Sequence, residues 1–350
     1  MKTADRHGSG GRRGDRRTVA IVGAGMAGLA CATMLASQGV PVEVFDKGRR
    51  PGGRIATRRT SFGFFDHGAQ YFTANDARFR AWTEEGKAAG MVARWDGAIA
   101  AVFDGRVQRT GDTEQRWLGV PGMSGLAAHL AASLAIRSEL RIAGLLRNGD
   151  AWRLLGHDGA AVGKANIVII AVPAPQGVEL LRASPRLASR AADAILQPCW
   201  GVMLGYAAPL PVLFDGAFVN SGPLSWICRN TSKPGRTGDE AWVVHASPDW
   251  SRDHVEDDEV SVCEALRRAF GEATGVEAPA PAFIAAHRWR YARVATPLGT
   301  PCLFDDELAI RACGDWCLGA NIEAASRSGE AMAETILAHL GVVVAASGSS

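Results

Sequence analysis

Gly23, Gly25 and Gly28 have the spacing of a glycine turn that binds a dinucleotide. In such a turn the first glycine makes the tight bend, the second lets the backbone approach a phosphate, and the third lets the following helix pack on the sheet. Backbone N–H groups and the positive end of that helix then face the phosphates. We therefore predict contacts to a pyrophosphate from Gly23, Ala24, Gly25, Met26, Ala27 and Gly28.

Asp46 and the eight residues after it favour FAD over NAD. The carboxylate of Asp46 would end a strand and accept both ribose hydroxyls of an adenosine. The same segment contains Lys47 and ends in Gly52, Gly53 and Arg54. The two glycines permit a close approach of the backbone, and the guanidinium offers a second clamp on the pyrophosphate. We predict non-covalently bound FAD, contacted here by Asp46, Lys47, Gly53 and Arg54.

The elements around these residues predict an α/β fold. A β-rich run at 18–22 precedes the glycines, a helix is expected over 28–37, and a second strand over 42–46, which makes a strand–helix–strand unit. Residues 148–150, Asn-Gly-Asp, are a strong hairpin signal. The unbroken apolar run at 167–172 is typical of a buried parallel strand.

After residue 176 the pattern changes to short strand candidates, with helices expected at 177–196 and 256–271. We predict a Rossmann-type FAD-binding domain and a second, β-rich substrate domain, both discontinuous. The FAD-binding domain is predicted at 17–76, 122–175 and 286–342, and the substrate domain at 77–121 and 176–285. Residues 1–16 are predicted to be a disordered basic leader and 343–350 a flexible tail.

The composition argues against several classes of partner. Of the 350 residues 47% are hydrophobic and 21% charged, and the formal net charge is +2, which gives no general case for nucleic acid or a membrane. A twin-arginine export signal at 12–17 is an alternative to the leader, but its removal would take the glycine turn with it. The seven scattered cysteines indicate buried thiols in a reducing cytoplasm and no metal site.

The Gly-Gly-Arg at 52–54 resembles the end of the FAD motif in amine-oxidase-like flavoproteins. Further blocks resemble the bacterial renalase-like branch of that superfamily. They are DKGRRPGGRIATRR at 46–59, FDHGAQYF at 65–72, AVPAPQ at 171–176, RNTSKPGR at 229–236, HRWRYA at 287–292 and GDW at 314–316. Each block is short, but their order and spacing make the set specific, and the match extends over nearly the whole chain.

The resemblance implies further contacts to FAD. Segment 65–72 would run beside the isoalloxazine, and the last helix would direct its positive end at the flavin N1/O2 locus. The contacts implied are Gly68, Ala69, Gln70, Ile142, Gly314, Asp315, Ile322 and Glu323. Ala320 and Ala324 stand where the family commonly has glycine, and their methyl groups require a negative φ.

Renalase-like proteins oxidise the 2- and 6-dihydro isomers of NAD(P)H to NAD(P)+ and pass the electrons to O2, forming hydrogen peroxide. The resemblance implies the same reaction here, with a reduced nicotinamide and O2 as partners and the donor carbon about 3–3.5 Å from the flavin N5. No acid/base residue is needed. Candidate residues for orienting the substrate are His67, Gln70, Tyr71, Asn220, Trp289 and Tyr291. Arg288 and Arg290 should share a strand face that binds phosphate or FAD, or is simply solvated.

Two alternatives stay open. One is an FAD-dependent amine oxidase or a desaturase of a small substrate. Against it, the sequence has only three tyrosines and lacks a Ser-Gly-Gly-Cys-type attachment segment. The other is a flavin-binding module with no turnover of its own, although no segment resembles a partner helix or an output domain.

Overall fold

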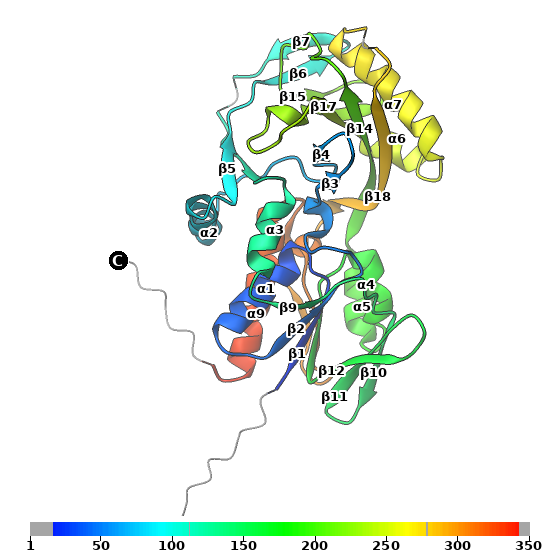
Figure 1. Cartoon of the computed structure of the whole chain (residues 1–350). Coiled ribbons are helices and arrows are strands. Elements are labelled where there is room, and N and C mark those ends of the chain that lie inside the picture. The colour runs from blue at the N-terminus through cyan, green and yellow to red at the C-terminus, as the bar shows by residue number, and fades with distance from the viewer. Residues whose placement is uncertain (1–16, 112, 278, 343–350) are drawn as a thin grey trace, which may run out of the picture.

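The computed structural model describes residues 17–111, 113–277 and 279–342, which form two lobes (Figure 1). The lower lobe in Figure 1 contains the N-terminal strand and the last helix, and the upper lobe is built mainly from the middle of the chain. The predicted leader at 1–16 and tail at 343–350 lie outside the described residues.

The lower lobe is built on a six-stranded sheet with the order β19-β20-β13-β1-β2-β9, in which only the β19–β20 pair is antiparallel. Its strands are β1 (Val19–Val22), β2 (Val42–Phe45), β9 (Ala135–Arg137), β13 (Ile167–Ile170), β19 (Leu303–Asp305) and β20 (Ile310–Ala312). Successive side chains of β1 enter two different hydrophobic cores: Val19 and Ile21 one, Ala20 and Val22 the other. Burial on both faces explains the unbroken apolar runs.

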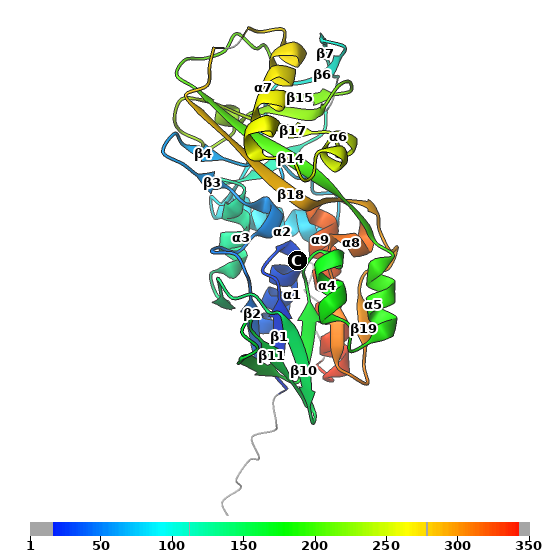
Figure 2. The ribbon, with the colours of Figure 1, turned by 90° about the vertical axis from the view of Figure 1, so that its right-hand side faces the viewer.

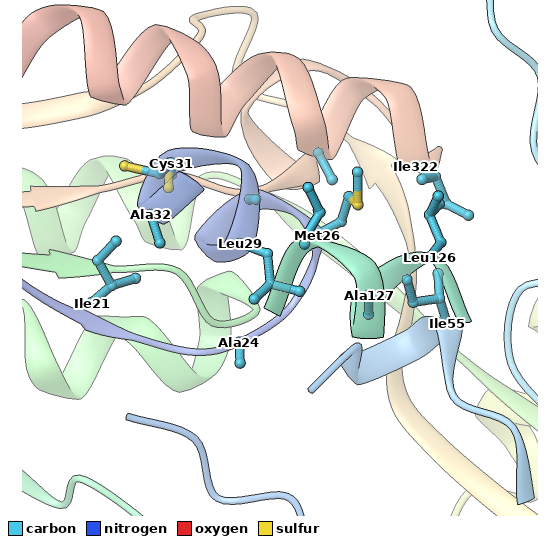
Figure 3. Close-up of a cluster of buried hydrophobic side chains, with 14 of the residues drawn as sticks. Ile21, Ala24, Met26, Leu29, Cys31, Ala32, Ile55, Leu126, Ala127 and Ile322 are labelled. Atoms are coloured by element: carbon cyan, nitrogen blue, oxygen red, sulfur yellow. The ribbon is translucent and has the colours of Figure 1, made fainter. Parts of the chain in front are cut away.

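Two helices far apart in sequence, α1 (Met26–Ser37) and α9 (Ile322–His339), pack together on one face of this sheet beside α3 (Ser124–Ala131) (Figure 3). They approach closely, since a Cβ at Gly329 of α9 would lie 2.1 Å from the carbonyl oxygen of Ala27. The other face is covered by α4 (Ala174–Leu180), α5 (Pro185–Ala192) and a three-stranded sheet. That sheet consists of β10 (Gly144–Asn148), β11 (Ala151–Leu155) and β12 (Ala161–Ala165).

The upper lobe is a seven-stranded sheet with the order β18-β14-β17-β16-β15-β6-β7. Its strands are β6 (Ile99–Phe103), β7 (Arg106–Arg109), β14 (Ile195–Tyr206), β15 (Gly216–Val219), β16 (Leu224–Arg229), β17 (Glu240–Ala246) and β18 (Phe283–Thr296). The helices α6 (Pro248–Asp253) and α7 (Glu259–Thr274) pack against it. Figure 2 shows β14 and β18 running side by side from this lobe down to the lower one.

Short elements join the lobes. They are the 3-10 helices η1 (Gly53–Ile55) and η2 (Asn230–Ser232), the pairs β3 (Arg58–Arg59) with β4 (Phe64–Phe65) and β5 (Val92–Trp95) with β8 (Arg116–Gly119), and the helix α2 (Ala77–Ala88). The short helix α8 (Asp315–Leu318) packs in the lower lobe beside α9. No helix among the described residues is long and apolar enough to cross a membrane. Six of the seven cysteines are buried, and all seven are free thiols.

The predicted fold class, a Rossmann-type domain with a second β-rich domain, is confirmed. The hairpin at 148–150 is also confirmed, with Asn148 opposite Ala151 and Gly149 at φ 63°. The single helix predicted at 177–196 is wrong: the chain turns between α4 and α5, where Pro185 begins the second helix, and β14 has already started at Ile195. β18 also pairs with β14 as far as Thr296, so the chain leaves the upper sheet later than the boundary expected at 286.

Candidate active site

A cavity of about 2100 Å³ runs between the lobes and is lined by both of them. Pockets for a single small ligand usually measure about 300–1,000 Å³. The space is therefore large enough for a dinucleotide and a second molecule. Its lower wall contains the glycine turn and the ends of the Rossmann strands, and its upper wall contains β18 and the end of β17.

The glycine turn between β1 and α1 has the geometry that phosphate binding requires. Gly23 has φ 112°, and a Cβ there would lie 2.6 Å from the carbonyl oxygen of Ala171. A Cβ at Gly28 would lie 2.0 Å from the carbonyl oxygen of Gly23. At Gly25 a Cβ would meet no described atom within 4 Å beyond its own chain neighbours, and this residue lines the cavity. The turn is thus closed on its protein side and open where a pyrophosphate would lie.

Asp46 is held at the end of β2 by two backbone N–H groups. Ala24 donates to one carboxylate oxygen and Gly48 to the other, each at 2.6 Å. A carboxylate has about four acceptor positions, so two remain for ribose hydroxyls. Lys47 lines the cavity beside it and donates to the Gln176 side chain at 3.1 Å. Ile142, on the segment before β10, also lines this end and is 7% exposed.

Arg54 and Asp315, expected separately along the cofactor, form one bidentate pair in the cavity wall. The two guanidinium nitrogens donate to the two carboxylate oxygens at 2.7 and 2.6 Å. Arg54 also donates to the carbonyl oxygen of Ala292 in β18, at 3.1 Å. The pair thereby connects η1, the start of α8 and the upper lobe, with Gly314 beside it in the lining.

The start of α9 borders the cavity through Ile322, while its glutamate points elsewhere. Asn321 caps the helix by accepting from the N–H of Ala324 at 2.7 Å. Glu323 accepts from the N–H groups of Asn75 and Asp76, at 2.5 and 3.1 Å, so its side chain fixes the start of α2. Neither Ala320 nor Ala324 has a positive φ, so the alanines that depart from the family pattern are accommodated without strain.

A cluster of imidazole and indole rings forms the upper wall. His67 stacks on Trp289, with ring centroids 5.2 Å apart, and His287 meets both rings edge-on at 4.8 and 4.3 Å. Trp289 and His245 both direct a ring nitrogen at the carbonyl oxygen of His67, at 3.0 and 3.2 Å. All four rings line the cavity, as does Tyr291. We call His67, His245, His287 and Trp289 the aromatic wall.

The imidazoles of this wall are neutral near pH 7. Burial, followed by the neighbouring His287, lowers the pKa of His67 to about 4. Burial likewise lowers the pKa of His245 to about 4 and lowers that of His287. His67 Nδ1 is buried and has no hydrogen-bond partner within the described chain. The wall therefore offers flat, uncharged surfaces to the cavity.

Behind the wall lies a buried charged network centred on Asp66. One oxygen of Asp66 accepts from the N–H of Met123 and the hydroxyl of Thr57, at 2.9 and 2.7 Å. The other accepts from Arg236 at 2.5 and 3.1 Å and from Lys233 at 3.4 Å. All three charged side chains are at most 1% exposed. The network joins the segment under Gly68, the start of α3 and the segment after β16.

Most of the residues predicted at the site line this cavity. They are Gly23, Gly25, Met26, Ala27, Asp46, Lys47, Gly53, Arg54, His67, Gly68, Ala69, Ile142, Trp289, Tyr291, Gly314, Asp315 and Ile322. Among the described residues, the lining does not include Ala24, Gly28, Gln70, Tyr71, Asn220 or Glu323.

Three substrate-orienting candidates therefore lie elsewhere, for different reasons. Gln70 turns inward, where it donates to the carbonyl oxygen of Gly68 at 2.9 Å and accepts from Lys233 at 3.0 Å. Tyr71 alternates to the opposite side and packs against Trp226 at 5.6 Å. Asn220 follows β15 and is exposed, and its backbone N–H donates a hydrogen bond to the Val102 carbonyl oxygen at 2.9 Å.

The residues that sequence reasoning missed come from segments far apart in the chain. His245 is the last residue but one of β17, a strand that is joined to β18 only through β14. Asp66, Lys233 and Arg236 all lie in blocks quoted for the family resemblance, and that was their only signal. Ion pairing across about 170 positions cannot be inferred from local pattern.

Comparison with known proteins identifies the family. Residues 86–337 match the family described as flavin containing amine oxidoreductase, and residues 21–85 match the NAD(P)-binding Rossmann-like domain. The chain belongs to the flavin-containing amine oxidoreductase family. It is an FAD-dependent oxidoreductase of the amine-oxidase type, and the open glycine turn, the ribose acid and the Arg54–Asp315 pair fit that cofactor.

The individual relatives are distant. The tRNA 5-methylaminomethyl-2-thiouridine biosynthesis bifunctional protein MnmC of Burkholderia mallei (strain SAVP1) is 27% identical over 252 residues, covering 59% of this chain. The match spans only 38% of that relative's length.

Solved structures share the fold over most of the chain. Cyclohexylamine oxidase from Brevibacterium oxydans IH-35A has a TM-score of 0.73 at 14% identity, covering 93% of this chain and 100% of that one. A candidate protoporphyrinogen oxidase from Exiguobacterium sp. 255-15 has a TM-score of 0.75 at 16% identity, covering 92% and 99%. Identities this low are informative about the fold alone.

Proposed function

We propose that this protein oxidises the 2- and 6-dihydro isomers of NAD(P)H to NAD(P)+. The chemistry supplied by bound FAD is acceptance of a hydride at N5 and re-oxidation by O2, which with a proton gives hydrogen peroxide. The role of the protein is to place a flat dihydronicotinamide ring against that acceptor. Besides the renalase-like sequence blocks, the charge and shape of the upper cavity wall support this proposal.

The observation that carries the proposal is the excess of positive charge on the upper part of the cavity. Five arginines from β3 and β18 line it: Arg58, Arg59, Arg288, Arg290 and Arg293. Arg58 and Arg293 form no ion pair with any residue that the structure describes. The upper lobe contributes one carboxylate to the lining, that of Glu259. Such a wall repels a protonated amine and attracts the phosphates of a dinucleotide.

The aromatic wall suits the other end of the same substrate. A dihydronicotinamide ring is planar and uncharged, and stacking surfaces such as the His67–Trp289 pair bind planar rings.

Anaerobic mixing of the FAD-loaded protein with candidate reductants tests the proposal. The panel contains 2-dihydro-NAD, 6-dihydro-NAD, ordinary NADH, and a set of amines that includes cyclohexylamine and putrescine. We expect rapid loss of flavin absorbance with the dihydro isomers, with one equivalent of NAD+ formed and one of peroxide released on aeration. Rapid bleaching by amines alone overturns the proposal.

Amine oxidation is the second candidate, because the family and several solved structures of the same fold are amine oxidases. A charge variant separates the two. Replacing Arg58 and Arg293 by glutamine should raise KM for phosphate-bearing substrates and lower it for a cationic amine. Dihydronicotinamide riboside, which has no phosphate, is the matched control and should change little.

A further inference from the structure

At the outer edge of the cavity, Arg288 and Arg290 hold one carboxylate between them. Arg290 donates to both oxygens of Glu256, at 2.6 and 2.8 Å, and Arg288 donates to one of them at 3.1 Å. The two arginines alternate with Trp289 along β18 and so share the strand face opposite the aromatic wall. Because β18 is the edge strand of its sheet, both of its faces border the same cavity.

The donor set suits a phosphate as well as the carboxylate it now holds. Two guanidinium groups direct three N–H bonds to two oxygens, whereas a phosphate offers at least three oxygens and more charge. Planar guanidinium pairs of this kind are the usual protein ligands of phosphate. Arg288 is further fixed by the ring of Trp200, 5.5 Å from its central carbon, and by a bond to the carbonyl oxygen of Val255.

Glu256 is placed so that it can leave. It lies in the turn between α6 and α7, and its side chain is 69% exposed. Its hydrogen bonds to Arg290 and Arg288 lower its pKa, so it is ionised at neutral pH and competes as an anion. Exposed ion pairs are weak, so an incoming ligand of higher charge can displace it.

We propose that Arg288 and Arg290 form a binding site for a phosphate group of the substrate, which Glu256 occupies when no substrate is present. Arrival of the phosphate displaces Glu256 and the turn that carries it. The identity of the ligand as a nucleotide rests on the proposed function. The site itself requires only a phosphate or pyrophosphate.

Binding of inorganic pyrophosphate to the FAD-loaded full chain, measured by calorimetry with no reductant present, tests the site apart from catalysis. Glu256→Gln should tighten binding about two- to fivefold, since the weak competing ion pair is lost. Arg290→Gln should weaken binding at least about tenfold, since two charge-assisted hydrogen bonds are lost. Phosphate monoester and ADP-ribose, tested alongside, show whether one phosphate suffices.

Matched controls come from the neighbouring helix α6. Asp249 and Arg252 form an exposed ion pair at 3.0 Å that does not involve Glu256, and neither residue lines the cavity. Asp249→Asn and Arg252→Gln change net charge by the same amounts and should alter affinity less than twofold. If Asp249→Asn changes the affinity as much as Glu256→Gln does, and Arg252→Gln as much as Arg290→Gln does, the changes reflect net charge alone. That outcome refutes the phosphate site.

Turnover distinguishes the two proposals. Pyrophosphate binding with the expected variant pattern, but without oxidation of dihydronicotinamides, supports the phosphate site and refutes the proposed function. Oxidation of dihydronicotinamides with a KM that Arg290→Gln leaves unchanged refutes the phosphate site and supports the function.

Discussion

Replacing Asp66 by asparagine should unfold the protein at a lower temperature by a predictable amount. The substitution keeps the shape of the side chain but leaves Lys233 and Arg236 buried without their counter-charge. Removing one member of a buried ion pair typically costs about 3–5 kcal/mol. Unfolding entropy is about 2.1 cal/mol/K per residue, so for 350 residues each kcal/mol shifts Tm by about 1.4 °C. The expected decrease is therefore about 4–7 °C.

The measurement is a thermal melt of the FAD-loaded protein followed by far-UV circular dichroism. Asp249→Asn is the control, because it removes an exposed carboxylate and should shift Tm by less than about 1 °C. Adding Lys233→Met to Asp66→Asn should recover part of the loss, since one of the two stranded cations is then gone. A decrease under 1 °C for Asp66→Asn, or strict additivity in the double variant, contradicts the account of this network.

The network should also respond to acid. Burial alone would raise the pKa of Asp66, but the charges of Lys233 and Arg236 and the hydrogen bond from Met123 outweigh it and lower the pKa. A lowered pKa means that this stabilisation is complete above the unfolded value of about 3.9 and is lost as pH falls below it. The Tm difference between the protein and Asp66→Asn should thus narrow below about pH 4.

Three further predictions concern the cavity. Gly28→Ala should lower the Tm of the FAD-free protein, because its Cβ would lie 2.0 Å from the Gly23 oxygen. Gly25→Ala should leave that Tm unchanged yet weaken FAD binding in a fluorescence titration. Arg54→Lys should release FAD at lower urea than Arg59→Lys, since a lysine cannot bond both oxygens of Asp315. The pKa of His67 is lowered to about 4, so its neutral imidazole stabilises the fold fully above about pH 6.5, and this stabilisation is lost as pH falls towards 4. His67→Asn should therefore make Tm depend less on pH between about 4 and 6.5. An unchanged pH profile would contradict a neutral buried imidazole.

The cofactor half of the site could be predicted from sequence because its signals are local. Val19 to Asp46 form one continuous strand–helix–strand unit, in which Gly28 is required by a contact with Gly23 and Gly23 by a contact with Ala171, just after β13. Gly314 and Asp315 required the resemblance, since nothing in their own segment shows that Arg54, 261 positions earlier, will pair with Asp315.

The substrate half was predicted less well because side-chain direction depends on register. His67, Gln70 and Tyr71 lie within five residues, yet only His67 faces the cavity. A shift of one residue along such a segment changes the side on which each chain lies. The side chain of Gln70 points inward because Lys233, from the other lobe, donates a hydrogen bond to its amide oxygen. Local pattern carries no information about that contact.

The two faces of β18 differ in chemistry, and the proposed function uses both of them. Its odd-numbered residues His287 and Trp289 face His67 and belong to an uncharged wall, and its even-numbered residues Arg288 and Arg290 face Glu256. A shift of the strand by one residue would bury a guanidinium group against the aromatic wall and expose the rings to solvent. Both changes are unfavourable in free energy. The strand thus places uncharged rings on one face and two guanidinium groups on the other. The substrate we propose, a reduced nicotinamide nucleotide, is planar and neutral at one end and anionic at the other, and so would suit both faces.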